Sequence, residues 1–544
     1  MRSRWPALAL SLAIPPVLVV TLLASRSCAE KKKAKPFPQV EILYNTLESH
    51  KQIAEAIAQM WKENLGVTVG LGNTEWKVYL DRMTKLDYEI ARGGWVFDYN
   101  DPHNGFECWQ TGNGNNRTGW SNGQYDKLIA EAMLQRDNAK RWELYQKAEE
   151  LLIDEAPIIP IYFYVNKNMV APKVKGWDDN VLNLHPYDAI WIEKDGKKAP
   201  PEEQKLVFNN GAEPQTLDPA IMSGIPEHRL ALGLFEGLCR LDPKTLAPLP
   251  GMAEKWEISE DGKTYTFHLR DAKWTNGDPV TSADFVYSWK RIIDPKALST
   301  PSEYAQIFDW IEGAKGVIRG EKGADVAKVG LAAPDAKTLV VKLEAPCPFF
   351  LNLCAFETLM PVHRKTVEKF GAEWTRERNI VSNGPFILNE WTINSKILFV
   401  PNETYYDRAR VNLREVAILP IDNLDTSLNK FIAGEVDWID DVPIARAEEV
   451  KKNPSFRVSP FLTVYFYRFN TSKPPFNDVR VRKAFSMAVN KRTICTKVQR
   501  FGEIPAGSCI PPRCGNPNFP TAKGLKYDPA EAKKLLAEAG YEVN

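Results

Sequence analysis

Two opposite charges flank a pair of glycines in the segment ARGGWVFDYNDP, residues 91–102. Arg92 and Asp98 are six residues apart, and Gly94 and Trp95 lie between them. The apolar start and the Tyr-Asn-Asp-Pro end predict a strand that runs into a turn. By residue type alone, we expect Asp98 to cap that turn and Arg92 to form a surface ion pair, unless the two charges bind a ligand.

No motif for catalysis accompanies these charges. The sequence contains no His-Glu-x-x-His, Gly-x-Ser-x-Gly or Walker loop, and its six histidines are dispersed. The segment GNGNN at residues 112–116 is typical of a loop and not of a phosphate cradle. The sequence therefore gives little support to catalysis, and we expect no enzyme, no cofactor and no metal. A secreted enzyme for peptides or glycans, with aromatic side chains as subsites, is the alternative of another class.

The composition is that of a globular chain with several domains. At about 100–200 residues per domain, 544 residues predict two to four domains. Lys and Arg total 70 and Asp and Glu total 69, so the charge balance gives no reason to expect a nucleic-acid partner. The 16 Trp and 18 Tyr residues serve either cores or pockets that hold varied ligands by flat contact.

The N-terminus resembles an export signal. Arg2 and Arg4 precede an apolar run over residues 5–24, and small residues follow it. Residues 1–29 are therefore predicted to be a cleaved signal, or a lipoprotein signal with Cys28 as the acylated residue. Either form places the protein in the periplasm or cell envelope. The alternative is a retained membrane anchor, as in a sensor with no role in transport.

Two cysteine pairs are close in the sequence. Cys347 and Cys354 form one, and Cys509 and Cys514 form the other. Outside the cytoplasm both pairs could form disulfides, and the alternative is that they are free buried thiols.

The residues before 166 have an α/β pattern. Strands are predicted at 40–44, 67–71 and 158–165. The first strand is followed by a helix whose inner face carries Ile53, Ile57, Met60, Trp61 and Leu65. Two further helices are predicted from the apolar spacing around residues 125–133 and 142–152.

The later chain is richer in strands and ends in a helix. A polar linker at residues 193–205 is expected to be exposed, and strands are predicted at 206–209, 264–269 and 338–343. The last helix has Asp528 as its N-cap and Pro529 at its first position. It ends where an α/β unit should continue into a strand, whereas the strand at 40–44 has no helix before it. Joining the two ends would complete a β–α–β–α unit.

Several long motifs resemble the oligopeptide-binding proteins of ABC importers, in the oligopeptide, dipeptide and nickel solute-binding family. The motifs that carry the resemblance are NNGAEPQTLDPA (209–220), MAEKWEISEDGKTYTFHLRDAKWTNGDPVTSADFVYSWKR (252–291), KPPFNDVRVRKAFSMAVNK (473–491), YDPAEAKKLLAEAGY (527–541), YNTLESHK (44–51) and ARGGWVFDYNDP. Their order differs from that of the family, because the family's C-terminal portion, about residues 36–194, precedes its N-terminal portion here. The resemblance thus implies a circular permutation in which the polar linker joins the old termini.

The resemblance implies an α/β fold with two lobes, a smaller third domain and a hinge between the lobes. One lobe, which binds the peptide, would combine residues 36–165 with 463–544. The other would combine 166–236 with 362–462 and contain the linker. The extra domain would be residues 237–361.

Site residues follow from the same motifs. Asp98 resembles the aspartate that binds a peptide's ammonium, and Arg92 and His50 resemble residues that meet its carboxylate. Gly94 and its neighbour Gly93 would let the peptide backbone approach as an added strand. The remaining predicted ligand contacts are Trp95, Val96, Trp76, Ser223 and Ile225. Without the resemblance, both tryptophans could equally be core residues.

Two departures from the family's pattern bear on the ligand. The lysine that serves longer peptides in some members appears here as Gln499, next to Arg500. A disulfide that some members make is absent, since Val96 and Thr463 stand at its positions.

The function implied is capture of oligopeptides outside the cytoplasm and delivery to an ABC transporter permease, by a protein that is a monomer. Within the family, the alternatives are receptors for dipeptides, nickel chelates or cell-wall peptides.

Overall fold

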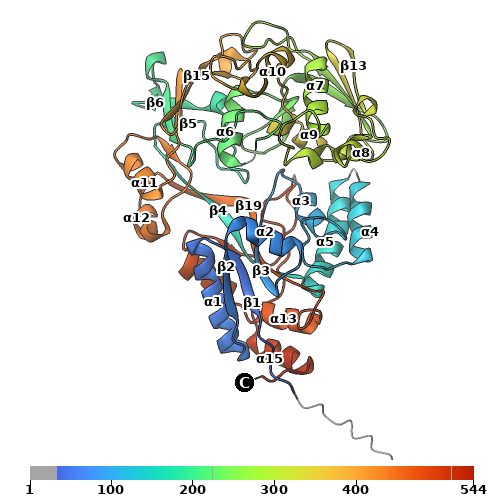
Figure 1. Cartoon of the computed structure of the whole chain (residues 1–544). Helices are drawn as coiled ribbons and strands as arrows, with labels where there is room; N and C mark the ends of the chain where they lie inside the picture. Colours follow the sequence, from blue (N-terminus) through green and yellow to red (C-terminus); the bar gives the residue numbers. More distant parts are fainter. Residues whose placement is uncertain (1–33, 136, 223, 516, 544) are drawn as a thin grey trace, which may run out of the picture.

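The computed structural model describes residues 34–543, with the exceptions of 136, 223 and 516 (Figure 1). The predicted signal with Cys28, and Ser223, therefore lie outside the described residues. The chain has an α/β fold with two lobes and a smaller domain beside the second lobe, as predicted. We keep the names first lobe, second lobe and extra domain for the ranges given above, whose boundaries stay predictions. Among the described residues, no helix has the length and apolarity to cross a membrane.

Three strands and a long helix form the start of the first lobe. Strands β1 (Glu41–Asn45) and β2 (Gly70–Thr74) pair in parallel, and β3 (Ile90–Val96) pairs with the other edge of β1. Helix α1 (Glu48–Leu65) crosses between β1 and β2, with its apolar face buried as predicted. The second strand was predicted three residues too early, at 67–71. Gly66 ends the helix at φ 72°, and the next residues bury Val67 and Val69 before the strand begins.

Two helices cover the side of the first lobe, and both were predicted. Helices α4 (Gly123–Met133) and α5 (Asn138–Glu155) pack against each other. Their first turns are capped by the side chains of Asn122 and Asp137.

Two long strands carry the sheet from one lobe into the other. Strand β4 (Ile158–Val170) pairs antiparallel with β19 (Phe456–Phe469), and β3 lies on the other edge of β19. The sequence placed the end of β4 at residue 165, five residues short, because the prediction included only its most apolar part. In the second lobe the sheet continues through β18 (Trp438–Ile439), β8 (Lys205–Asn209), β17 (Glu415–Leu419), β16 (Lys396–Pro401) and β15 (Phe386–Thr392).

The extra domain has its own four-stranded sheet. The order is β11 (Ala253–Ile258), β12 (Thr264–Leu269), β14 (Thr338–Lys342) and β13 (Leu331–Asp335). Helix α7 (Ser282–Ile293) packs on it and starts with a capping box between Thr281 and Asp284.

Most residues of the polar linker are exposed, as predicted, but the segment is ordered. Strands β6 (Trp191–Lys194) and β7 (Lys197–Lys198) form a hairpin around a two-residue Asp-Gly turn. Gln204 is buried, and its amide bonds the backbone of Ile192 and Ala199 at 2.8–3.0 Å. These hydrogen bonds order the linker although most of its residues are exposed.

The two ends of the described chain lie together at the base of the first lobe (Figure 1). Helix α15 (Pro529–Glu538) packs against α1, and Asp528 caps it as predicted. Lys35 then pairs in parallel with Tyr541, and its N–H donates to the Gly540 carbonyl at 3.0 Å. The expected neighbourhood of the last helix and the first strand is confirmed.

The proposed permutation makes a prediction about connectivity. A chain reopened between Asp195 and Gly196, with residue 542 joined to residue 34 by a short linker, is expected to keep the fold. Its melting temperature should stay within about 3 °C, because the new break falls in an exposed turn and the joined ends already pair. Circular dichroism and differential scanning fluorimetry measure this. A control reopened after Ala148, inside α5, should not fold; loss of folding in the first variant would contradict the prediction.

Candidate functional site

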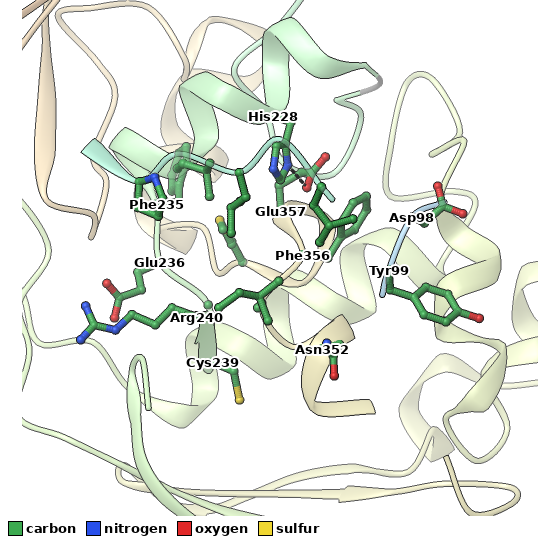
Figure 2. Close-up of a pocket in the computed structure, with 18 of the residues that line it drawn as sticks. Asp98, Tyr99, His228, Phe235, Glu236, Cys239, Arg240, Asn352, Phe356 and Glu357 are labelled. Atoms are coloured by element: carbon green, nitrogen blue, oxygen red, sulfur yellow. Dashed lines mark hydrogen bonds and ion pairs between the residues drawn. The ribbon is translucent and has the colours of Figure 1, made fainter. Parts of the chain in front are cut away.

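A cavity of about 340 Å³ lies where the first lobe, the second lobe and the extra domain meet (Figure 2). The first lobe contributes residues 96–100, directly after β3. The second lobe contributes helix α6 (Ile225–Leu234) and the residues that follow it, and the extra domain contributes Tyr304 and residues near 352–360. Much of the wall is apolar and comprises Leu182, Leu184, Ile225, Leu232, Phe235, Phe356, Met360 and Phe461.

Asp98 presents a carboxylate to this cavity without a cationic partner. Among the described residues, no Lys, Arg or His pairs with it; its Oδ2 accepts only from Asn104 Nδ2, at 3.3 Å. Burial raises the pKa of Asp98 to about 6. The capping role expected from residue type belongs to another residue, because Asp101 accepts from the His103 N–H at 2.9 Å. Asp98 is thus free to meet a cation.

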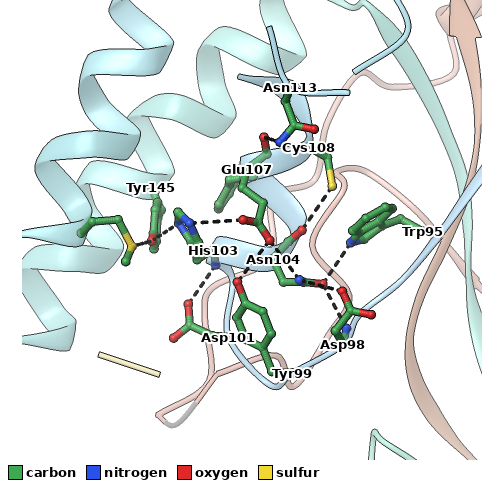
Figure 3. Close-up of polar contacts among 12 residues, drawn as sticks. Trp95, Asp98, Tyr99, Asp101, His103, Asn104, Glu107, Cys108, Asn113 and Tyr145 are labelled. Atoms are coloured by element: carbon green, nitrogen blue, oxygen red, sulfur yellow. Dashed lines mark hydrogen bonds and ion pairs between the residues drawn. The ribbon is translucent and has the colours of Figure 1, made fainter. Parts of the chain in front are cut away.

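Asn104 holds the Asp98 carboxylate in place (Figure 3). Its Oδ1 accepts from the Asp98 N–H at 3.2 Å and from the Trp95 indole at 3.0 Å. Its amide also donates to Glu107 Oε1 at 3.1 Å. Asn104 and Glu107 were not predicted from the sequence. Their position in the short helical segment after the turn was a signal, because that segment returns the chain to the end of β3.

Glu107 stays close to neutral at physiological pH. Burial, and then the nearby charge of Asp98, raise the pKa of Glu107 to about 8. Tyr99 donates its hydroxyl to Glu107 at 3.2 Å, and Arg141 forms a buried bidentate pair with Asp101 at 2.6 and 2.7 Å. The loop is therefore rigid, and Asp98 is the residue in it that carries an uncompensated negative charge.

Arg92, in strand β3, carries the opposite charge, and we call Arg92 and Asp98 the two poles of the site. Its guanidinium lies 4.8 Å from the centre of the Tyr465 ring and 3.5 Å from the Tyr164 hydroxyl. Among the described side chains no carboxylate pairs with it, so it forms no surface ion pair, and its buried Nε has no hydrogen-bond partner. Burial and then Arg92 lower the pKa of nearby His50 to about 4, so that this imidazole is neutral. A carboxylate would compensate the Arg92 charge.

One edge of β3 between these poles is open. Strand β19 pairs with β3 along its whole length, whereas β1 pairs only with Ile90 and Ala91. The Arg92 carbonyl already accepts from the Tyr79 hydroxyl, so an extended ligand backbone could add along residues 93–96. Gly94 is half-buried in this stretch. Gly93 serves another purpose than the predicted ligand approach, because a Cβ there would lie 2.3 Å from the Phe466 ring.

The other predicted residues divide into two groups. Val96 and Ile225 line the cavity, and Trp95 lies beside it through its bond to Asn104. Gln499 and Arg500 do not line this cavity, and their role in ligand binding stays a prediction: Gln499 is buried, and Arg500 pairs with Glu448 at 3.0 Å. Arg500, which follows a π-helical segment (Ile494–Gln499), lines a separate depression beside the start of α1. The Trp76 side chain lies outside what the structure describes.

A second ionisable pair, also missed from the sequence, faces the cavity. His228 Nδ1 lies 2.6 Å from Glu357 Oε2, and the pair joins the second lobe to the extra domain (Figure 2). His228 comes from the second lobe and Glu357 from the extra domain, and both add polar groups to the largely apolar wall of the cavity.

The sequence matches the family model of bacterial extracellular solute-binding proteins, family 5 (Middle), over residues 24–117 and 247–544. The protein belongs to this family. As a family 5 protein it resembles the periplasmic oligopeptide-binding protein OppA of Salmonella typhimurium, with 41% identity over 351 residues. YgiS of Escherichia coli, named as a deoxycholate-binding periplasmic protein, is 36% identical over 68% of this chain and 69% of its own length.

Solved structures agree with this assignment. The Escherichia coli murein tripeptide binding protein MppA has a TM-score of 0.55 and 37% identity, over 63% of this chain and 67% of that protein. The match to OppA covers 63% of this chain and 64% of OppA, so the family 5 chain spans less than two thirds of that relative's length.

The raised pKa of Asp98 predicts how stability depends on pH. Its folded pKa of about 6 exceeds the ordinary value of 3.8, so ionised Asp98 destabilises the fold above pH 6, and this cost disappears below pH 3.8. Asp98→Asn should therefore raise the melting temperature of the ligand-free protein at pH 7.5 by a few degrees, roughly the effect of 1–2 kcal/mol, and by nothing near pH 3.5. Differential scanning fluorimetry at both pH values measures the change. Asp81→Asn, at an exposed ion pair, is the matched control; lower stability of Asp98→Asn at pH 7.5 would contradict the assignment.

Proposed function

We propose that the protein captures peptides in an extended conformation between its two lobes, outside the cytoplasm, and delivers them to an ABC transporter permease in the membrane. It does so as a monomer. One observation carries the proposal: the open edge of β3 lies between a carboxylate that lacks a cation and a guanidinium that lacks an anion. These two charges are complementary to the ammonium and carboxylate ends of a peptide that adds to this edge.

The spacing fits a short peptide. Six residues of extended chain span at most about 20 Å, and a peptide strand rises about 3.3 Å per residue. A ligand of a few residues can therefore bridge Asp98 and Arg92. Because this grip uses only the backbone and the termini, it tolerates varied side chains, which the apolar wall near Asp98 accommodates.

The alternatives within the family differ in what they require. A nickel chelate needs metal-compatible donors, and the described residues contain no cluster of three or more His, Cys, Asp or Glu side chains that could hold a metal. Dipeptides and cell-wall peptides would use the same two poles. A ligand such as a bile acid would meet Arg92 with a carboxylate and leave Asp98 unpaired. Ligand charge therefore decides among these classes.

The role of Asp98 predicts that affinity depends on a free ligand ammonium. Trialanine should bind, and N-acetyl-trialanine should bind at least about 100-fold more weakly, because a buried charge is left unpaired. Isothermal titration calorimetry measures both affinities. Asp98→Asn should abolish the preference, and Asp81→Asn should retain it. Equal affinity of the unmodified protein for both ligands would refute the role of Asp98.

The role of Arg92 predicts a matching dependence on the ligand carboxylate. The protein should bind trialanine about 10–100-fold more tightly than its C-terminal amide, by the usual coupling of a close charge pair. Arg92→Met should bind both ligands with similar affinity, so that a double-mutant cycle gives the coupling directly. Arg82→Met, at a half-exposed ion pair with Asp87, is the control. A preference for the free acid that survives in Arg92→Met would rule out this pole.

A further inference from the structure

The chain crosses between the second lobe and the extra domain at two adjoining segments, which we call the neck. It enters the extra domain near residue 237 and leaves it near residue 361, and the two neck segments lie side by side. The Cys239 N–H donates to the Cys354 carbonyl at 3.2 Å. The contact is tight: a Cβ on Gly237 would lie 2.4 Å from the Cys354 carbonyl oxygen.

Two buried thiols meet at this neck. Cys239 and Cys354 are 1% and 0% exposed, and Cys239 also lines the cavity. Burial, followed by the hydrogen bond and charge of the Cys239 thiol, raises the pKa of Cys354. The two residues are therefore in direct backbone contact, although they are 115 positions apart in the sequence.

The backbone geometry suits a covalent link. Cys239 begins strand β9 (Cys239–Leu241) and Cys354 ends helix α9 (Phe350–Leu353). Because their backbones are joined by the 3.2 Å hydrogen bond, standard bond lengths keep the two Cα atoms within about 7 Å of each other. Disulfides span Cα separations of about 4.4–6.8 Å, with the commonest values near 5.5–6 Å. Neither pair suggested by sequence spacing is bonded: the seven cysteines among the described residues are free and buried.

We propose that Cys239 and Cys354 form a disulfide when the chain folds outside the cytoplasm, and that this bond closes the neck of the extra domain. The two S–H bonds break, one S–S bond forms, and two protons are released. The two electrons pass to a disulfide oxidant such as oxidised glutathione, which is reduced to two thiols. The reaction precedes burial, since the folded neck excludes solvent from both sulfur atoms.

The bond would act on the cavity as well as on stability. Glu236 and Arg240 flank Cys239, and Asn352 and Phe356 flank Cys354; all four line the cavity. A link at the neck therefore fixes two walls of the cavity against each other (Figure 2). This inference rests on the extracytoplasmic location of the family and not on the identity of the ligand.

Peptide mapping tests the link directly. The full chain is refolded with reduced and oxidised glutathione, unfolded, alkylated with iodoacetamide and digested without reductant. Mass spectrometry should show the Cys239 peptide joined to the Cys354 peptide, and alkylated Cys108, Cys347, Cys495, Cys509 and Cys514. Recovery of both Cys239 and Cys354 in alkylated form, or of either one joined to another cysteine, would overturn the proposal.

A second measurement separates this bond from other thiol chemistry. Reduction should lower the melting temperature of the oxidised protein by at least about 3 °C, because the bond restricts a loop of more than 100 residues in the unfolded chain. Cys347→Ser should show the same fall, whereas Cys239→Ser should show none and leave Cys354 alkylated. An equal fall in Cys239→Ser would assign the effect to another pair and overturn the proposal.

Discussion

The antiparallel pairing of β4 with β19 is the constraint on which the rest of the structure depends. These strands of 13 and 14 residues run through both lobes, so the two lobes share one sheet. Their register shifts between Pro460 and Val464, where the ladder passes from one lobe to the other. Asn166 bonds the Asn180 and Pro460 carbonyls and the Ser459 hydroxyl there. A break in an otherwise continuous ladder gives the lobes a defined axis for hinge motion without separating them.

The same pairing positions the charges. Because β19 holds β3 along its whole length, Arg92 and Asp98 occupy fixed places at the two ends of one open edge. Burial raises the pKa of Asp98, so its charge costs stability, and both charges are held by neutral groups: tyrosines around Arg92, and Asn104 beside Asp98. Under the proposed function, this arrangement would be preorganised for a ligand that brings both missing charges, so little further ordering would be needed on binding.

The position of the chain ends has little effect on this architecture. Lys35 and Tyr541 pair at the base of the first lobe, far from the cavity, and the hairpin at residues 191–198 lies at the edge of the second lobe (Figure 1). The segments that carry the family's motifs therefore fit into one fold, although their order along the chain differs from that of the family. Loop-closure entropy depends only weakly on how elements are connected, which makes a permuted order physically reasonable.

Local patterns in the sequence determined most of the helices and strands, because period and capping are properties of neighbouring residues. The apolar faces of α1 and α4, the cap of α15 and the strand β12 all follow from such patterns. The motifs also determined the family and pointed to Asp98 and Arg92. Only the tertiary structure decided what surrounds Asp98, since Asn104 and Glu107 act through side-chain contacts that spacing does not encode. The tertiary structure alone brought His228 to Glu357 and Cys239 to Cys354, and placed Arg500 beside Glu448. Contacts between residues so distant in the sequence depend on how the lobes and the extra domain pack.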